Sequence, residues 1–242
     1  MKITYIYHSC FLVELEENIL LFDWFKGDLP KLNSNKQIYV FSSHKHHDHF
    51  DMKIFEQLKD YPKVHYVFSK DIRLGPNYLQ RNGVENSVKE EITFVGKNRE
   101  YELGEDKYRI QIKTLTSTDA GVAFVINCEG KNIYHAGDLN WWSWPGEEFE
   151  EENRMELAYT EEINKLMDTH LDVAFVVLDP RQEERYWWGF DYFMNVVGAE
   201  TVFPMHCWGR YDIIRMLEQE TRTAKYRNYI VSIEEENQVF TL

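Results

Sequence analysis

The chain has 242 residues, of which 43% are hydrophobic and 28% are charged, and its formal net charge at pH 7 is −14. This is the composition of a globular chain rather than a disordered one, with enough apolar residues for a sizeable core. The acidic balance argues against a general nucleic-acid binder, because such a protein needs a basic face to replace phosphate counterions. We expect one domain over residues 1–242 and no nucleic-acid partner.

The distribution of cysteines and the hydropathy of the sequence predict a cytoplasmic location. Cys10, Cys128 and Cys207 are widely spaced and form no CxxC pair, as is typical of reduced thiols in the cytosol. Glu14 and Glu16 interrupt the first apolar run, so the N-terminal stretch lacks the pattern of a signal peptide. No stretch approaches about 18 uncharged apolar residues, so no membrane span is expected. Oligomerisation stays open.

Strand-length apolar runs dominate the first part of the chain. They lie at 3–9, 11–16, 19–23, 37–43, 64–69, 91–96, 108–115, 121–130 and 131–138, with one helical pattern at 51–61. Helices are then predicted at 147–167, 189–198 and 212–222, and strands at 172–180, 200–206 and 229–235. This order predicts two sheets covered by helices. Polar residues stand at several strand ends, where ligand sites commonly form.

The segment "SSHKHHDHF" places four histidines and an aspartate directly after a predicted strand. His44 and His46 are two residues apart, so an extended backbone would project both imidazoles to one side. Asp48 and His49 follow a short turn. Such a loop could offer two imidazoles to one metal, and a carboxylate and an imidazole to a second. The alternative is a chance polar loop, and for this composition the pattern H-x-H-x-D-H would arise by accident with a probability of about one in a thousand.

Two further strand ends could complete a metal site. "YHAGD" supplies His135 and Asp138, and "FPMHCW" supplies His206. Imidazole and carboxylate ligands together suit Zn²⁺, Mn²⁺ or Fe²⁺, with zinc the default. His47 occupies a variable position of the histidine motif, and we interpret it as a loop residue that binds no metal.

The series His44-x-His46-x-Asp48-His49, His135, Asp138 and His206 resembles the ligand series of the metallo-β-lactamase superfamily. In closer detail the chain is similar to the branch that includes the ascorbate-6-phosphate lactonases. The segments "YIYHSCFLVE", "LLFD", "YHAGD" and "FPMHCW" correspond to that branch's motifs, with Tyr7 where glycine is usual. The resemblance covers essentially the whole chain. It implies an α+β fold, a four-layer αββα sandwich.

The resemblance also implies a dinuclear site with two divalent metal ions, of which zinc is expected and manganese or iron are alternatives. His44, His46 and His135 would hold the first metal, Asp48, His49 and His206 the second, and Asp138 would bridge both. Asp23 resembles a carboxylate that orients a ligand imidazole and fixes its tautomer. His8 corresponds to a residue near the site, with a structural role as the alternative.

The implied activity is hydrolysis of a small-molecule ester, lactone or phosphoester by water that the two metals activate. Asp138 and Asp48 are the predicted catalytic carboxylates: the first fixes the metal separation, and the second accepts or shuttles a proton. Cys207 is interpreted as an inert thiol. The alternatives are a phosphodiesterase or nuclease on the same scaffold, an iron-dependent oxidoreductase, and a non-catalytic metal-binding relic.

Aromatic residues gather close to the strand ends in the segments 141–144 and 186–188. Together they predict an aromatic rim around a substrate pocket, with Trp141 and Trp208 as candidate contacts. Arg181 and Arg210 lie near the same strand ends and are candidates for binding a carboxylate or a phosphate. For any single aromatic residue, packing in the core or in a dimer is the alternative.

Overall fold

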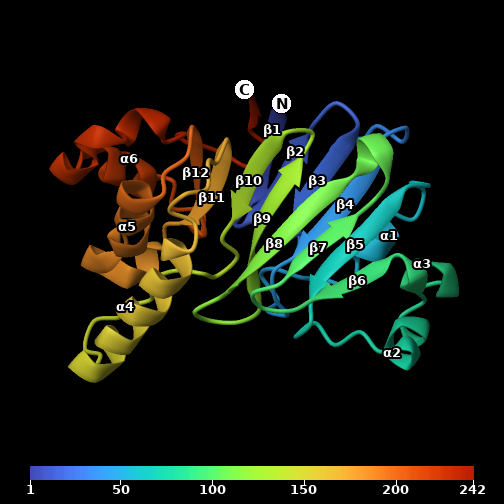
Figure 1. Ribbon diagram of the computed structural model, residues 1–242, viewed down its shortest axis with the longest axis horizontal. Coiled ribbons are helices and arrows are strands. Elements are labelled where there is room, and N and C mark those ends of the chain that lie inside the picture. The colour runs from blue at the N-terminus through green and yellow to red at the C-terminus, as the bar shows by residue number, and fades with distance from the viewer.

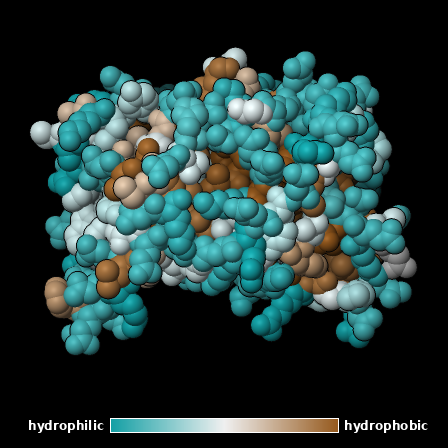
Figure 2. All heavy atoms as spheres, viewed as in Figure 1, coloured by the Kyte–Doolittle hydropathy of each residue, from teal (hydrophilic) through white to brown (hydrophobic). Residues whose placement is uncertain are grey.

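The computed structural model describes residues 1–242 apart from the side chain of Asn86, and it contains two β-sheets between layers of helices (Figure 1). Helices α1 to α3 lie beside the first sheet, and α4 to α6 lie beside the second (Figure 1). This arrangement confirms the predicted αββα sandwich. Hydrophilic residues cover most of the face seen in Figure 2, with apolar residues visible between them.

The first sheet has the strand order β13-β1-β2-β3-β4-β5-β6. Its strands are β1 (Lys2–Tyr7), β2 (Cys10–Glu14), β3 (Asn18–Phe22), β4 (Gln37–Ser42), β5 (Val64–Ser69), β6 (Ile92–Val95) and β13 (Val239–Thr241). Strands β3 to β6 run parallel to one another. The β-branched and aromatic runs of β3 and β4 are buried almost without interruption, as is typical of parallel strands covered on both faces.

The second sheet has the order β12-β11-β10-β9-β8-β7. Its strands are β7 (Glu100–Leu103), β8 (Ile110–Thr116), β9 (Val122–Cys128), β10 (Lys131–His135), β11 (Val173–Val177) and β12 (Thr201–Met205). Strands β10, β11 and β12 are parallel, and the others pair antiparallel.

The α-helices are short except for α4. They are α1 (Ile54–Gln57), α2 (Pro76–Arg81), α3 (Asn86–Glu90), α4 (Phe149–Asn164), α5 (Trp188–Val196) and α6 (Asp212–Gln219). Short 3₁₀ segments lie at Asp106–Tyr108, Pro180–Arg185, Thr221–Lys225 and Arg227–Tyr229, and the second of these is kinked at Glu183. None of the helices in the described part of the chain has the length and apolar character that crossing a membrane would require.

Aromatic rings from both sheets form the main core. Phe11 of β2 lies 4.3 Å from Phe175 of β11, and Phe41 of β4 lies 5.2 Å from Phe124 of β9, measured between ring centroids. All four side chains are fully buried, so burial of their apolar surface holds the two sheets together. A second apolar cluster, which includes Phe55 of α1, covers the outer face of the first sheet.

The predicted strand at 229–235 is wrong. Only Ile230 pairs there, in an isolated bridge with Val202, and the final strand is β13 instead. The segment ends in Glu234 and Glu235, which are exposed, so it offers no second row of apolar side chains to a sheet. The short strand β7 and the helices α2 and α3 were not predicted, because their segments are too short for a clear periodicity.

The parallel strands place several polar residues at one edge of the sandwich. In the first sheet, β3 leads into Asp23 and β4 into the histidine loop 43–49. In the second sheet, β10, β11 and β12 lead to Asp138, Asp179 and His206 in turn. Carboxyl ends of parallel strands lie on the same side of a sheet, so each sheet brings its polar residues to a shared edge.

Two backbone hydrogen bonds join the sheets at this edge. The Val122 N–H donates to the Ser43 carbonyl at 3.0 Å, and the His206 N–H donates to the His8 carbonyl at 3.2 Å. Gly121 makes the first contact possible, because a Cβ there would lie 1.9 Å from the Ser43 oxygen, and its φ is +66°. The two strand-end clusters are therefore held against each other by the backbone.

Candidate metal centre

Eight side chains converge at the shared edge in two adjoining groups. The ligand atoms of each group lie within 4.8 Å of one another. The first group is His44, His46, Asp119 and Asp138, and the second is His8, Asp48, His49 and His206. Each group combines imidazoles and carboxylates, the donor mixture that divalent zinc, manganese and iron accept.

Asp138 lies between the two groups. Its Oδ2 is 3.3 Å from His44 Nε2, while its Oδ1 is 3.2 Å from His49 Nε2 and 3.3 Å from His206 Nε2. Burial alone would raise the pKa of Asp138, but the neighbouring His49 and His206 outweigh burial and hold that pKa well below its ordinary range. An ionised carboxylate with one oxygen toward each group has the geometry expected of a bridging ligand.

A buried carboxylate stands behind one imidazole of each sheet. Asp23 Oδ2 accepts from His49 Nδ1 at 2.7 Å, and Asp179 Oδ2 accepts from His206 Nδ1 at 2.9 Å. Burial would raise the pKa of Asp179, but hydrogen bonds from His206 and Arg181 outweigh it and lower that pKa to about 2. Both carboxylates therefore keep a proton on Nδ1 and turn the Nε2 atom toward Asp138. The sequence pointed to Asp23 and missed Asp179.

Several buried polar atoms at the centre lack hydrogen bonds. They are Nε2 of His49, Nε2 of His206, Oδ1 of Asp138 and both ring nitrogens of His8. Buried nitrogen and oxygen atoms almost always have a partner in folded proteins, so such a set requires an explanation. These atoms face one another as lone-pair donors, and a divalent cation would satisfy them together. The residues present thus fit a metal ion.

The structure does not bring His135 to either group. Its Nε2 donates to the Ser9 carbonyl at 2.9 Å, and its Nδ1 accepts from the Gly137 N–H at 3.1 Å. Its ring stacks on Phe22 at 4.8 Å inside the sandwich, and burial lowers its pKa, so the imidazole is neutral. With both nitrogens bonded to the backbone, no lone pair remains for a metal. The predicted assignment of His135 to the first metal is therefore corrected.

Asp119 stands where the third ligand of the first group was expected. It lies in the turn between β8 and β9, and its Oδ2 is 3.4 Å from His46 Nδ1. Nothing in the sequence singles it out, because one aspartate in a turn is ordinary. Its position in the chain could have pointed to it, because it lies in the hairpin of β8 and β9. Strand β9 pairs with β10, and β10 leads to Asp138.

His8 lies within the second group rather than beside it. Its ring centroid is 4.0 Å from that of His206, and its Nε2 is 3.6 Å from Asp48 Oδ2. Burial lowers the pKa of His8 to about 4, so its imidazole is neutral at pH 7, as a metal ligand must be. The side chain of His47, by contrast, is 92% exposed and belongs to neither group.

Three residues at the centre have left-handed backbone conformations. The φ angles of His8, Asp23 and His206 are 57°, 45° and 66°. Residues other than glycine rarely adopt this region, and each such residue costs roughly 1–2 kcal/mol. The surrounding fold holds all three at one edge, which is a pattern often found at functional sites.

A cavity of about 500 Å³ opens onto the two groups. It is lined by His46, His47, Asp48, Thr118, Asp119, Asp138, Trp142, Trp144, Met155, Arg181, His206 and Trp208. Of the predicted substrate contacts, Arg181 and Trp208 line it. Arg210 instead pairs with Asp212 at 2.9 Å on the surface. Trp141 packs against Trp188 outside this cavity.

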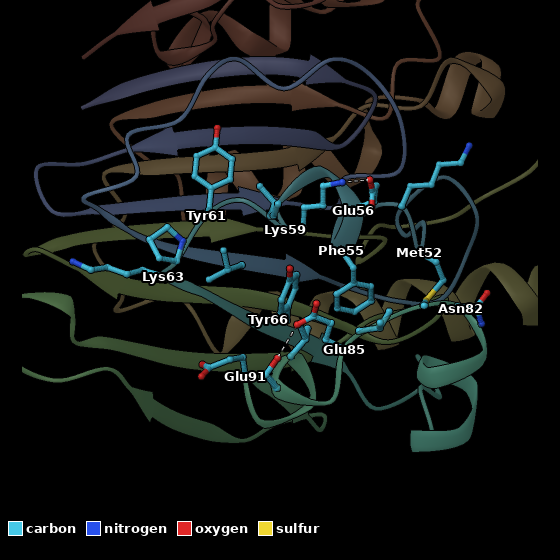
Figure 3. A pocket seen from close by; sticks show the side chains of 18 of the residues that line it. Met52, Phe55, Glu56, Lys59, Tyr61, Lys63, Tyr66, Asn82, Glu85 and Glu91 are labelled. Carbon is cyan, nitrogen blue, oxygen red and sulfur yellow. Dashed lines mark hydrogen bonds and ion pairs between the residues drawn. The ribbon is translucent and has the colours of Figure 1, made fainter.

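A larger cavity, of about 780 Å³, lies elsewhere and carries no comparable chemistry (Figure 3). It is bounded by α1, β5 and the segment that leads into α3. Phe55 and Tyr66 line it together with Glu56 and Lys59, which form an ion pair with each other (Figure 3). Neither metal-type group described above contributes to its lining, so the smaller cavity is the candidate active site.

Comparison with known proteins agrees with this geometry. The family model of the beta-lactamase superfamily domain matches residues 2–155. The chain belongs to this superfamily. Its sequence is 30% identical over 150 residues to a protein of Alkaliphilus metalliredigens named "UPF0173 metal-dependent hydrolase", a match that covers 57% of this chain. The chain spans 63% of the length of the curated relatives it matches.

Solved structures share the fold of this superfamily member. Igni18, described as a novel metallo hydrolase from the archaeon Ignicoccus hospitalis, superposes with a TM-score of 0.62 at 16% identity, over 100% of this chain and 98% of that one. CmlA, a diiron beta-hydroxylase from Streptomyces venezuelae, superposes with a TM-score of 0.56 at 12% identity, over 85% of this chain and 44% of that one. At these identities the similarity shows the fold alone.

Proposed function

We propose that this protein is a hydrolase that uses two divalent metal ions, one held by each group at the shared edge. The observation that carries the proposal is the set of buried, unpartnered donor atoms on His49, His206 and Asp138, which face one another across the centre. Zinc suits the mixture of nitrogen and oxygen donors, and manganese or iron are the alternatives.

The residues of the chain have distinct tasks in this proposal. Bound cations would lower the pKa of water and polarise the bond to be cleaved. Asp138 would fix the distance between the two groups, because one of its carboxylate oxygens faces each group. Burial would raise the pKa of Asp48, but the neighbouring imidazoles of His8 and His49 outweigh it and keep that pKa below its ordinary range. Asp48 lines the cavity beside the second group, and this position supports the proposal that it accepts or shuttles a proton.

The cavity favours a small-molecule substrate. Its volume lies within the roughly 300–1,000 Å³ of small-ligand pockets, and three tryptophans supply apolar surface. Arg181 is the only lysine or arginine among its lining residues, which gives no basic track for a nucleic-acid backbone. We therefore propose an ester, a lactone or a phosphoester of a small molecule as the substrate class.

Metal analysis followed by a substrate panel tests the proposal. The purified protein is stripped with a chelator, reloaded with zinc, manganese or iron, and assayed on lactones, 4-nitrophenyl esters, a phosphodiester and a short RNA. We expect two metal ions per chain, hydrolysis that disappears on chelation and returns on reloading, and a large loss for Asp138→Asn. Binding of less than one metal ion per chain under metal-replete conditions would refute the dinuclear proposal.

An iron-dependent oxidation is the second candidate, because of the donor set of the first group. His44, His46 and Asp119 give two imidazoles and a carboxylate, the combination typical of non-haem iron oxygenases. Oxygen consumption by protein loaded anaerobically with Fe²⁺ separates the two candidates. Hydrolysis by the zinc form, with no oxygen uptake by the iron form, supports the hydrolase; the opposite result supports the oxidoreductase.

A further inference from the structure

Arg181 lies at the cavity between two tryptophan rings. Its Cζ is 4.5 Å from the ring centroid of Trp208 and 5.8 Å from that of Trp144. About half of its side chain is exposed, and it lines the same cavity as Asp138 and His206. At these distances, cation–π attraction to the two tryptophan rings restricts the orientation of the guanidinium plane.

One edge of this guanidinium is already fixed by Asp179. The Nε of Arg181 donates to the two carboxylate oxygens at 3.0 and 2.9 Å, and Nη2 donates to Oδ2 as well. Asp179 is fully buried, so the pair is anchored in the protein interior. The Nη1 atom has no hydrogen-bond partner within the described part of the chain. Arg181 therefore keeps a free donor edge in a fixed orientation.

The surface beside Arg181 is apolar and aromatic. Trp142 and Trp144 stack with centroids 5.7 Å apart and an interplanar angle of 8°, and Met155 lines the cavity with them. Trp208 is 37% exposed although it is a large hydrophobic residue. A rigid charged donor next to an apolar shelf matches a molecule with one anionic end and an apolar body.

The charge of the cavity is compatible with such a ligand once metals are bound. Asp48, Asp119 and Asp138 are the carboxylates that line it. Two divalent cations would more than neutralise these three carboxylates, so an anion would meet no net repulsion. Binding of an anion at this cavity therefore rests on the proposed function, in which two metal ions are bound.

We infer that the substrate is an amphipathic anion whose carboxylate or phosphate group binds the Nη1 edge of Arg181. Its apolar part lies on the shelf of Trp142, Trp144 and Trp208, and its scissile bond faces the metal groups. Arg210, which is already paired on the surface, takes no part. Asp179 is a positioning residue, because it fixes both Arg181 and the imidazole of His206.

A pair of esters that differ only in a terminal carboxylate tests the inference. Zinc-loaded wild type is assayed on 4-nitrophenyl hemiglutarate and on 4-nitrophenyl pentanoate. We expect kcat/KM to favour the anionic ester by about tenfold or more, the scale of a charge-assisted hydrogen bond. Arg181→Met should abolish this preference by lowering kcat/KM for the anionic ester, and Arg181→Lys should keep part of it. Arg210→Met, the matched control, should keep all of it.

Binding gives a readout that does not depend on turnover. The affinities of 4-phenylbutyrate and of the neutral 4-phenylbutyramide are measured by calorimetry on wild type and Arg181→Met, with the metal content of each determined. We expect the variant to lose about tenfold or more in affinity for the acid and none for the amide. Equal losses for both, or a loss that follows a fall in metal content, would assign Arg181 a structural role only and overturn the inference.

The outcomes for the two proposals are separable. Hydrolysis of both esters without a carboxylate preference, together with equal binding of acid and amide, removes the anionic substrate and leaves the hydrolase intact. If neither ester is hydrolysed under any metal, the hydrolase proposal loses its support. In that case the calorimetry still decides whether Arg181 recognises an anion.

Discussion

His49 and Asp23 are joined by a fully buried hydrogen bond of 2.7 Å between Nδ1 and Oδ2. Asp23 is itself fixed by Ser43, whose backbone N–H and hydroxyl each donate to it at 2.7 Å. The imidazole is therefore held in one orientation before any metal binds, with its Nδ1 proton directed at Asp23.

Replacing Asp23 by asparagine tests this orientation. Because the amide can donate to Nδ1 and favour the other tautomer, we expect metal affinity to fall by about 10- to 100-fold. A competition titration against a chromophoric chelator measures the change. Asp60→Asn, at an exposed position, is the control and should bind metal like the wild type. Equal affinities for both variants would argue against an orienting role.

Asp119 and His135 give opposite expectations. Asp119→Ala should reduce the metal content by about one ion per chain, because it removes a donor of the first group. His135→Gln should leave the metal content unchanged but lower the free energy of unfolding by about 2 kcal/mol, because buried hydrogen bonds to Ser9 and Gly137 are disturbed. Elemental analysis and urea titration measure the two effects. Loss of metal from the His135 variant alone would restore the assignment made from the sequence.

His8 and His47 form a matched pair of histidine substitutions. His8→Ala should weaken binding at the second group by about tenfold or more, because a buried neutral imidazole is removed from it. His47→Ala should bind metal as the wild type does, since its side chain is 92% exposed. Calorimetric titration of the metal-free protein checks both. Equal behaviour of the two variants would exclude His8 as a ligand.

Side chains that the sequence selected lie together at the candidate centre where chemistry and position in the chain coincide, and fewer do so where packing decides. The motif of His44, His46, Asp48 and His49 could be found because its spacing is unusual. His135 was misassigned because a histidine at a strand end can point into the core, and only the fold shows that the Ser9 carbonyl accepts its proton. Short-range patterns contain no information about such contacts.

The long-range partners were also beyond the sequence. Asp119 and Asp179 reach the centre only because β9 pairs with β10 and β11 lies between β10 and β12. The buried strands, by contrast, were predictable from their apolar runs, whereas the short helices beside the first sheet have too few turns for a periodic signal. The fold was thus easier to predict than the exact membership of the site.

Alanine substitutions at Gly121 and Gly130 distinguish the cost of a steric clash from the cost of backbone strain. Both have positive φ, +66° and +73°, but only at Gly121 would a Cβ meet other atoms, 1.9 Å from the Ser43 oxygen. Gly130→Ala should cost about 1 kcal/mol in the free energy of unfolding. Gly121→Ala should cost about 3 kcal/mol or more and weaken metal binding, because the histidine loop must move. Urea titration of both variants provides the comparison; equal costs would show that the contact with Ser43 can relax.

Cys128 provides a pH test away from the metal centre. Burial, followed by the charge of Glu129, raises the pKa of its thiol from 9.0 to about 12. Between these values the unfolded chain loses the proton and the folded chain keeps it, so stability is fully present below pH 9 and declines as pH rises. We expect a loss of about 1 kcal/mol between pH 9 and pH 10 that Cys128→Ala lacks. Equal pH slopes would refute the expectation.

Each metal group draws its ligands from both sheets. His44 and His46 of the first group and His8, Asp48 and His49 of the second belong to the first sheet's loops, whereas Asp119, Asp138 and His206 come from the other sheet. Neither sheet alone supplies all the ligands of either cation, so each bound cation would link the two sheets of the sandwich. Bound metal would then add to the stability of the folded chain as well as supply its chemistry, beside the aromatic core that already joins the two sheets.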